Sequence, residues 1–411
     1  MSSFSIPLTG LKSSTTALNT IANNLANMNT TAFKSQDVSF SDLFYQQIGS
    51  SGSGDPLVVG AGSQVAATST DFTEGSVNST GNVNDMAIGG STGAGFFVVQ
   101  NGNTTEYTRD GSFTVSASGN LTTQGGLNVM GFPVVGGVVN INAPLTPIQL
   151  PVGSSQQPAA TSNLSLTANL DSTAAVGDVA AGQVQLYDSL GKSYNANVSF
   201  TKTGVNTWDY SFALPAGAST GGANLTGTLT FDANGNLTSP AANVAGISFT
   251  GMNDGAANLT FNWNLYGASG QPSVTQFATP SDVSGYVQDG YASGQYEGFT
   301  VAGDGLISAK FSNGQTAPVG QLALANVVNP QGLMVGAGNL YQTTLASGAA
   351  SIGVAGTGGL GTIQDGALEA SNVDISSEFS NLIIAQQAYE ASSKAITTFN
   401  TVSQETINMI H

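Results

Sequence analysis

Few side chains in this 411-residue sequence offer the chemistry of catalysis or metal binding. There is no cysteine, and the single histidine is the final residue, His411. Cysteine nucleophiles are therefore excluded, and histidine-based triads and zinc sites are disfavoured. We expect a chain that is not an enzyme and that uses no cofactor.

One segment resembles the start of a calcium-binding loop. Asp232, Asn234 and Asn236 have the spacing of the first ligands of such a loop, but Asn243 stands where the loop needs a bidentate Glu. A tight turn is the better interpretation of this segment. The sequence leaves open whether a metal binds between Asp232 and Asn236.

The charge balance excludes two classes of partner. The chain carries 7 basic and 24 acidic residues, for a net charge of −17, and only 8% of its residues are charged. Nucleic acid and anionic lipid are bound mainly through Lys and Arg, so we expect no nucleic acid and no membrane insertion. No apolar run has the length of a signal-peptide core or a transmembrane helix. Export would therefore use a route without a cleaved signal.

Apolar residues at seven-residue spacing mark both ends of the chain. The N-terminal stripe consists of Phe4, Leu11, Leu18, Ile21, Leu25 and Met28. The C-terminal stripe consists of Ile375, Phe379, Leu382, Tyr389, Ile396, Ile407 and Ile410. This spacing is typical of a coiled-coil seam. We expect two terminal helices that bury these stripes against each other, against copies of the chain, or against both, so self-assembly is the first hypothesis.

The C-terminal helix carries two further patterns. Asp374 suits the N-cap, and Glu378 in the first turn suits the positive end of the helix dipole. Gln386, Ser393 and Asn400 lie seven residues apart on a face that is polar and nearly uncharged. That face is either ordinary solvated surface or the neutral wall of a water-filled space.

The sequence between the helices reads as β structure. Short β-rich runs alternate with turn signals such as Asn101-Gly102 and Asp110-Gly111. A proline cluster between residues 144 and 158 marks a boundary. After it, nine aromatic residues could fill the core of one sandwich or barrel: Tyr194, Phe200, Trp208, Tyr210, Phe212, Phe231, Phe249, Phe261 and Trp263.

The expected fold class is α+β and mainly β, in a nested multi-domain chain with coiled-coil-like terminal helices. We expect the helices at 1–33 and 370–411, with connecting segments at 34–70 and 346–369. We expect an inner β domain from 71–145 and 285–345. The outer β domain, 146–284, is inserted in the inner one.

Three ordered motifs point to a known family. The first is Ile21-Ala22-Asn23-Asn24-Leu25, which continues to Phe33-Lys34. The second is Tyr107-Thr108-Arg109-Asp110-Gly111-Ser112-Phe113, with Gly119-Asn120-Leu121 after it. The third runs from Ala370-Ser371-Asn372-Val373-Asp374 to Ser393-Lys394. Together they resemble the signatures of the bacterial flagellar rod and hook axial proteins. The family usually has Gly where Ala32 stands, a residue type that eases a left-handed turn.

The resemblance implies a mechanical role. In that family the terminal helices form an inner tube around an export channel, and the inserted domain faces outward. The insertion at 146–284 favours a hook subunit, which stacks into a short curved tube that transmits torque from rod to filament. Gln386, Ser393 and Asn400 would then line the channel, and the polymer would lie outside the cell.

The resemblance also implies partners. They are further copies of the chain, the distal rod protein, the hook–filament junction protein, the hook cap and the flagellar export apparatus. Two alternatives stay open: a distal rod protein with an insertion, and a secreted β-rich surface protein or adhesin. An enzyme built on a β fold would need an acidic cluster in a cleft, which spacing alone does not reveal.

Overall fold

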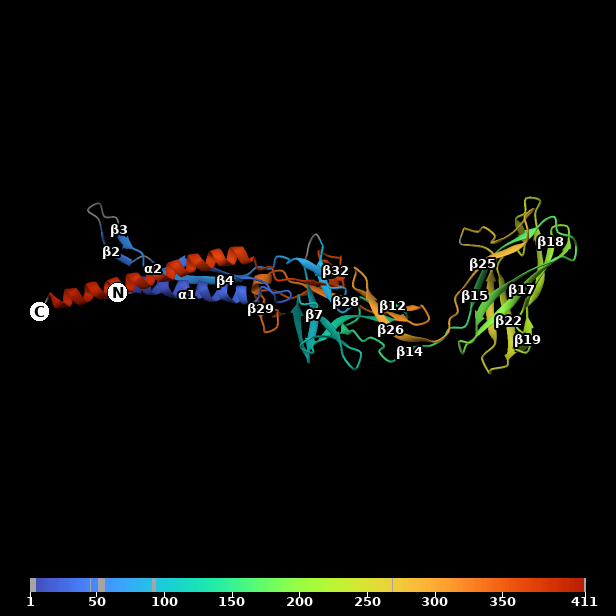
Figure 1. The fold of residues 1–411 in the computed structure, drawn as a ribbon, viewed down its shortest axis with the longest axis horizontal. Coiled ribbons are helices and arrows are strands. Elements are labelled where there is room, and N and C mark those ends of the chain that lie inside the picture. The colour runs from blue at the N-terminus through green and yellow to red at the C-terminus, as the bar shows by residue number, and fades with distance from the viewer. Residues whose placement is uncertain (1–4, 45, 51–55, 91–93, 268, 410–411) are drawn as a thin grey trace. The chain divides into compact units, whose positions relative to one another are not determined.

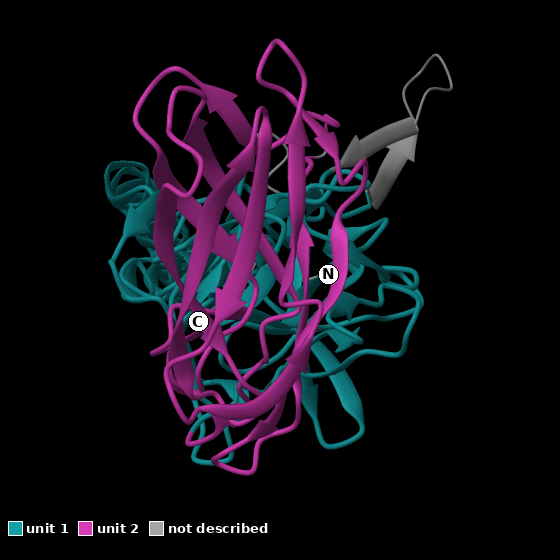
Figure 2. Cartoon of the chain, turned by 90° about the vertical axis from the view of Figure 1, so that its right-hand side faces the viewer, with its two compact units in different colours: residues 1–152, 299–309, 317–411 teal, residues 153–298, 310–316 magenta. Residues whose placement is uncertain are grey.

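The computed structural model describes residues 5–44, 46–50, 56–90, 94–267 and 269–409. Strands dominate the chain and a long helix lies near each end, so the predicted fold class is confirmed. The chain divides into two compact units (Figure 2). Unit 1 contains residues 1–152, 299–309 and 317–411, and unit 2 contains residues 153–298 and 310–316. Neither described helix has the length and apolar composition of a membrane span.

The two helices of unit 1 are α1 (Ser5–Ala26) and α2 (Ile375–Asn408), and they lie side by side (Figure 1). The predicted N-cap of α2 is confirmed, because the side chain of Asp374 accepts a hydrogen bond of 2.8 Å from Ser377 N. Helix α1 is rich in Ser, Thr and Asn, which favour the helix only weakly. Packing rather than propensity must therefore stabilise α1.

Residues 36–70, expected to be a connection, instead contain paired strands. Strand β1 (Gln36–Asp42) pairs antiparallel with β4 (Ser63–Thr70), and β2 (Gln46–Ser50) pairs with β3 (Pro56–Val59). The β1–β4 hairpin packs against α1, where Ser13 Oγ lies 3.2 Å from Ser63 Oγ. Its Ser, Thr and Gln side chains resemble a linker in sequence, but a hairpin with one covered face tolerates them.

Strands from both halves of the sequence build the rest of unit 1. Strand β28 pairs with both β7 and β11, while β30 pairs with β8. The strands concerned are β5 (Val77–Ser79), β6 (Met86–Gly89), β7 (Phe96–Asn101), β8 (Thr104–Thr108), β9 (Phe113–Val115), β10 (Leu121–Thr123), β11 (Asn128–Val135), β12 (Val138–Val139), β13 (Thr146–Pro147), β27 (Leu306–Phe311), β28 (Thr316–Asn326), β29 (Met334–Val335) and β30 (Leu340–Gln342).

Residues 346–369, also expected to be a connection, belong to the β structure too. Strand β31 (Ser351–Val354) pairs with β28, β32 (Thr362–Asp365) pairs with β6, and β33 (Ala367–Glu369) pairs with β5. The last two pairings join residues that are far apart in sequence, so local Gly and Thr content did not reveal them. The C-terminal segment is thus fixed to the N-terminal half up to the start of α2.

Unit 2 is a β-sandwich. One sheet has the order β16-β17-β18-β20-β21, and the other has the order β19-β22-β23-β15-β24, with β25 on β15. All nine predicted core aromatics are buried in one cluster shared by both sheets, which confirms that prediction. The strands are β15 (Asn163–Asp171), β16 (Val179–Tyr187), β17 (Ser193–Gly204), β18 (Thr207–Ala213), β19 (Ser219–Ala223), β20 (Thr226–Phe231), β21 (Leu237–Ser239), β22 (Val244–Met252), β23 (Leu259–Asn264), β24 (Val274–Phe277) and β25 (Asp282–Gln288).

Candidate assembly interface

Helices α1 and α2 meet along a narrow seam of small and polar residues. A Cβ placed on Gly10 would lie 3.1 Å from Ser392 Oγ, and Asn24 Nδ2 donates to Glu378 Oε1 at 2.9 Å. The two contacts are 14 residues apart on each helix (24 − 10 and 392 − 378), so the helices run antiparallel. Ala17 lies midway between Gly10 and Asn24 on α1, and Ala385 lies midway between Glu378 and Ser392 on α2, each seven residues from both. Small residues there let the two backbones approach closely.

The predicted apolar stripes are adjacent to this seam rather than within it. Leu11, Leu18, Ile21 and Leu25 on α1 are half-buried, as are Leu382 and Ile396 on α2. The other described members stay exposed, with fractions of 36% for Met28, 46% for Ile375, 49% for Phe379, 39% for Tyr389 and 56% for Ile407. Phe4 and Ile410 fall outside the described residues. The helix pair therefore leaves much of both stripes uncovered.

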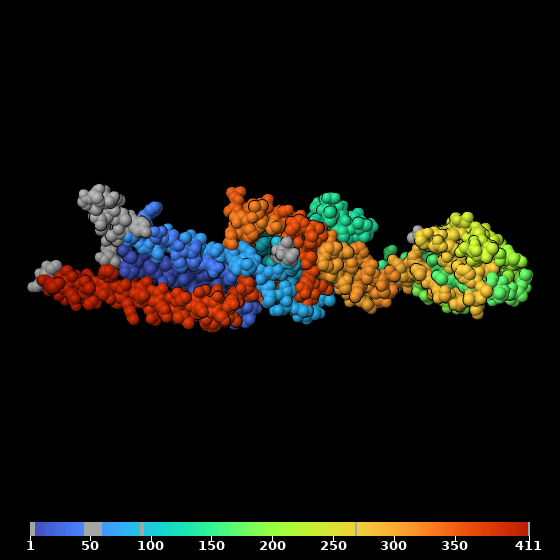
Figure 3. Space-filling view, turned by 90° about the horizontal axis from the view of Figure 1, so that it is seen from above, coloured from blue at the N-terminus to red at the C-terminus, as the bar shows by residue number. Residues whose placement is uncertain are grey.

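The C-terminal part of α2 extends beyond the described start of α1 (Figure 3). Val402 and Met409, which the sequence analysis did not single out, are also exposed there. Gln386 and Asn400 are exposed and Ser393 is half-buried. Two of the three predicted neutral positions are therefore open to solvent.

A buried ionic cluster joins the first two sequence motifs to Glu369, the residue directly before the third motif. Glu369, on β33, lies 2.6 Å from Lys34 Nζ through Oε1 and 3.2 Å from Arg109 Nε through Oε2. Oε1 also accepts a 3.0 Å hydrogen bond from Gly75 N. Each charged side chain in the cluster is at most 3% exposed. Removing one partner of such a buried group leaves an uncompensated charge, which is costly.

Burial shifts the pKa of two groups around this cluster. It lowers the pKa of Lys34 below its ordinary value, and the Glu369 carboxylate opposes that shift. Burial raises the pKa of Tyr341 to about 12. The Tyr341 ring packs on Phe72 and Phe96, with ring centroids 5.5 and 5.4 Å away.

Hydrogen bonds to backbone groups hold the residues after α1 close to the residues before α2. Ala32 has a φ of 55°, so the left-handed turn is kept although the residue is not Gly. Its N–H donates to the carbonyl oxygen of Glu369 at 2.8 Å. Asn372 accepts from Ser35 N at 2.8 Å and donates to the carbonyl oxygen of Asp71 at 2.9 Å. The exit from α1 and the approach to α2 are thus held by one set of contacts.

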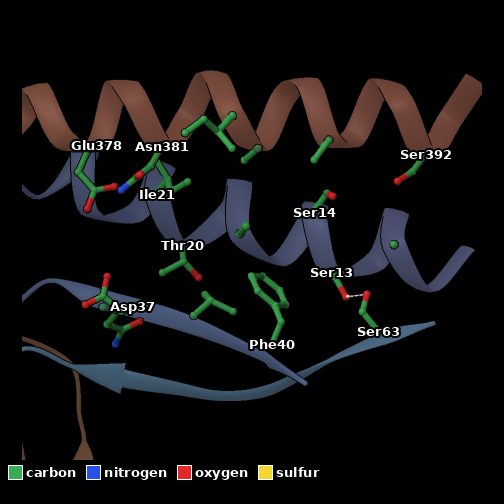
Figure 4. A pocket seen from close by; sticks show the side chains of 17 residues that line it. Ser13, Ser14, Thr20, Ile21, Asp37, Phe40, Ser63, Glu378, Asn381 and Ser392 are labelled. Atoms are coloured by element: carbon green, nitrogen blue, oxygen red, sulfur yellow. Dashed lines mark hydrogen bonds between the residues drawn. The ribbon is translucent and has the colours of Figure 1, made fainter. Parts of the chain in front are cut away.

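A pocket of about 550 Å³ lies where α1, α2 and the β1–β4 hairpin meet (Figure 4). We call it the helix pocket. Its walls include apolar side chains such as Ile21, Phe40 and Ile384. Glu378 and Asp37 are its acidic residues, and no basic side chain among the described residues lines it.

The segment that resembled a calcium loop is a turn in the structure. Asp232 Oδ1 accepts hydrogen bonds of 2.8 Å from both Asn234 N and Asn236 N. The hydrogen bond from Asn236 N is the main cause that lowers the pKa of Asp232. This carboxylate therefore stabilises its own turn, in agreement with the favoured interpretation.

The fold and the paired ends are those of flagellar axial proteins. The chain matches the family models described as "Flagella basal body rod protein" (residues 8–34), "Flagellar hook protein FlgE/F/G D1 domain" (91–166), "Flagellar basal body protein FlaE D2 domain" (169–291) and "Flagellar basal body rod FlgEFG protein C-terminal" (364–409). Two relatives that match nearly the whole chain identify which of these families it belongs to.

The flagellar hook protein FlgE of Escherichia coli (strain K12) is 33% identical over 420 residues, covering 99% of each chain. The flagellar hook protein FlgE of Treponema pallidum (strain Nichols) is 33% identical over 458 residues, covering 98% of each. The crystal structure of Helicobacter pylori flagellar hook protein FlgE2 shares the fold, with a TM-score of 0.54 at 16% identity over 71% of this chain and 100% of that one. This chain belongs to the flagellar hook protein family.

Proposed function

We propose that this chain is the structural subunit of the bacterial flagellar hook, and that it polymerises through its terminal helices into a hollow curved tube. The tube acts as a universal joint between rod and filament. One observation carries the proposal: the antiparallel helix pair uses a small-residue seam, leaves most of the described α2 stripe exposed and leaves most of the α1 stripe only half-buried. Exposed apolar stripes of this kind mark a protein–protein interface.

The ionic cluster supports the mechanical part of the proposal. Torque reaches the helices only if they are firmly attached to the β structure of unit 1. Glu369, Lys34 and Arg109 provide a buried attachment between segments that are far apart in sequence. Sliding of such rigid units past one another would let the tube bend while it turns.

The finer assignments follow from the same proposal. The chain lies in the hook, outside the cell. Its neighbours are the distal rod protein, the hook–filament junction protein and the hook cap, and it passes through the flagellar export apparatus. Gln386, Ser393 and Asn400 face the channel, where neutral side chains do not retain passing charged chains. We assign it no catalytic role.

Electron microscopy of the purified full-length chain under polymerising conditions tests this function. We expect hollow tubes, and a chain that stays monomeric under all such conditions would contradict the proposal. A rod protein with an insertion is the second candidate, since models of rod proteins match residues 8–34 and 364–409. Deleting residues 150–280 separates the two, because a rod protein would still assemble a straight rod in its cell.

A further inference from the structure

The helix pocket has an acidic end that Asn24 organises. The buried Asn24 side chain donates to the carbonyl oxygen of Gln36 and to Glu378 Oε1, both at 2.9 Å, and accepts from Gln36 N at 3.0 Å. It therefore brings the start of β1 and the first turn of α2 together. Asp37 and Glu378 consequently lie near one end of the same pocket (Figure 4).

The negative charge at this end is incompletely compensated. Glu378 is only 8% exposed, and its Oε2 is buried without a hydrogen-bond partner among the described residues. The α2 dipole offsets part of this charge. Asp37 is exposed and forms no ion pair within the described chain. A cation in the pocket would interact with both carboxylates in a partly desolvated setting, where charge interactions are strong.

The chain has few basic residues that could supply this cation. Three of its seven basic residues are buried: Lys34, Arg109 and Lys202. Lys192 pairs with Asp254, and Lys310 lies on β27. The remaining two, Lys12 and Lys394, lie exposed on the terminal helices. Lys394 lies four residues after Glu390 on α2, a spacing that allows a pair within the helix. Helix α1 has no carboxylate, so Lys12 has no such alternative.

Lys12 of the same chain is too far away to fill the acidic end. It lies 12 residues before Asn24 on α1 (24 − 12), which corresponds to about 18 Å along a helix. A neighbouring parallel copy displaced by about 18 Å along the helix axis would bring its own Lys12 to the level of Asn24. A lysine has a flexible four-carbon stem suited to a pocket whose walls are partly apolar and whose end is acidic.

We propose that Lys12 of a second copy inserts into the helix pocket and pairs with Asp37 beside Glu378. This inference rests on the proposed function and specifies one of its contacts. The helix pocket would then be a binding site selective for positive charge, and this contact would set the axial stagger of neighbouring subunits. The scarcity of other exposed lysines on the helices keeps this register unambiguous.

Charge reversal with the full-length chain tests the contact. K12D and D37K each place like charges in the helix pocket. We expect each to raise the critical concentration for polymerisation about tenfold. The double variant K12D/D37K restores opposite charges and should return to within about threefold of the wild type. Both positions are exposed, so circular dichroism of the monomers should be unchanged. E378Q, which keeps the side chain's shape, should weaken polymerisation in the same direction.

K394D is the matched control, because it changes the other exposed lysine of the terminal helices. We expect it to polymerise like the wild type. Equal effects of K12D and K394D, an inactive double variant, or an unaffected K12D would each overturn the proposal. If Mg²⁺ or Ca²⁺ restored polymerisation of the K12D variant, the proposal would also be overturned, because the helix pocket would then bind a metal ion. If wild type forms no tubes, the proposed function itself fails; if wild type and K12D form tubes equally, only this contact fails.

Discussion

Lys34 Nζ lies 2.6 Å from Glu369 Oε1, and the two side chains are 1% and 0% exposed. The pair connects the residues that follow α1 to the strand that precedes α2. Arg109, from the β structure of unit 1, completes the cluster at 3.2 Å. One buried carboxylate therefore secures both terminal segments to the domain that must turn with them.

We predict that K34M opens this junction. Removing one partner of a buried pair typically costs about 3–5 kcal/mol, so the free energy of local opening should fall by that order. Hydrogen exchange at the amide of Ala32, which donates to the Glu369 carbonyl, reports the opening directly. The control is K192M, whose partner Asp254 lies 3.5 Å away at a partly exposed site, and it should leave this exchange unchanged. Equal protection in K34M and the wild type would refute the prediction.

Tyr341 predicts a loss of stability in alkali. Its pKa rises from an ordinary value of 10 to about 12 in the folded chain, so the unfolded state loses the phenolic proton first. The stabilising contribution is therefore fully present below pH 10 and is lost as pH rises through about 12. The loss should approach about 2–3 kcal/mol.

The variant Y341F isolates this effect, because the other tyrosines are common to both proteins. The difference in urea midpoint between wild type and Y341F should be constant below pH 10 and should shift in favour of Y341F above it. A difference that stays constant through the alkaline range would show that Tyr341 is not the group responsible.

We predict that A32G stabilises the junction. Ala32 has a φ of 55°, a conformation that costs other residues free energy but not Gly. Loss of the buried methyl offsets part of the benefit, so the net gain should be below about 1 kcal/mol. Thermal unfolding measures it, with A67G on the exposed face of β4 as a control that should destabilise. A lower melting temperature for A32G would contradict this account.

The neutral face of α2 is predicted to serve export. Replacing Gln386, Ser393 and Asn400 together by Lys should slow filament growth more than it weakens the hook, because a charged wall retains chains of opposite sign. Filament length in cells, compared with the mechanical integrity of isolated hooks, measures the two effects. The neutral set Q386N, S393T and N400Q is the matched control. Filaments of normal length in the lysine variant would contradict the assignment of these three residues to the channel wall.

Sequence periodicity predicted the elements that depend on local pattern. Alternation and aromatic content were sufficient to predict the sandwich core around Trp208 and Trp263, because each strand of unit 2 shows its buried face in its own sequence. The same holds for the cap at Asp374, whose partner Ser377 is three residues away.

Contacts between distant or small residues escaped the pattern. The seam of Gly10 and Ala17 has no apolar bulk, so the larger Leu stripe beside it dominated the heptad signal. The cluster of Lys34, Arg109 and Glu369 joins three segments that are far apart in sequence, and Glu369 itself lies on β33, whose pairing with β5 has no local signal. The motifs containing Lys34 and Arg109 could be recognised in the sequence, but their shared contact with Glu369 could not.

Removal of the terminal helices tests the central claim most directly. A variant lacking residues 1–33 and 370–411 retains the sandwich of unit 2, whose burial can be checked by the fluorescence of Trp208 and Trp263. Electron microscopy of cells producing this variant should show no hook tubes, and the cells should not swim. Ordinary tubes in motile cells would contradict the claim that the incompletely buried stripes of α1 and α2 build the polymer.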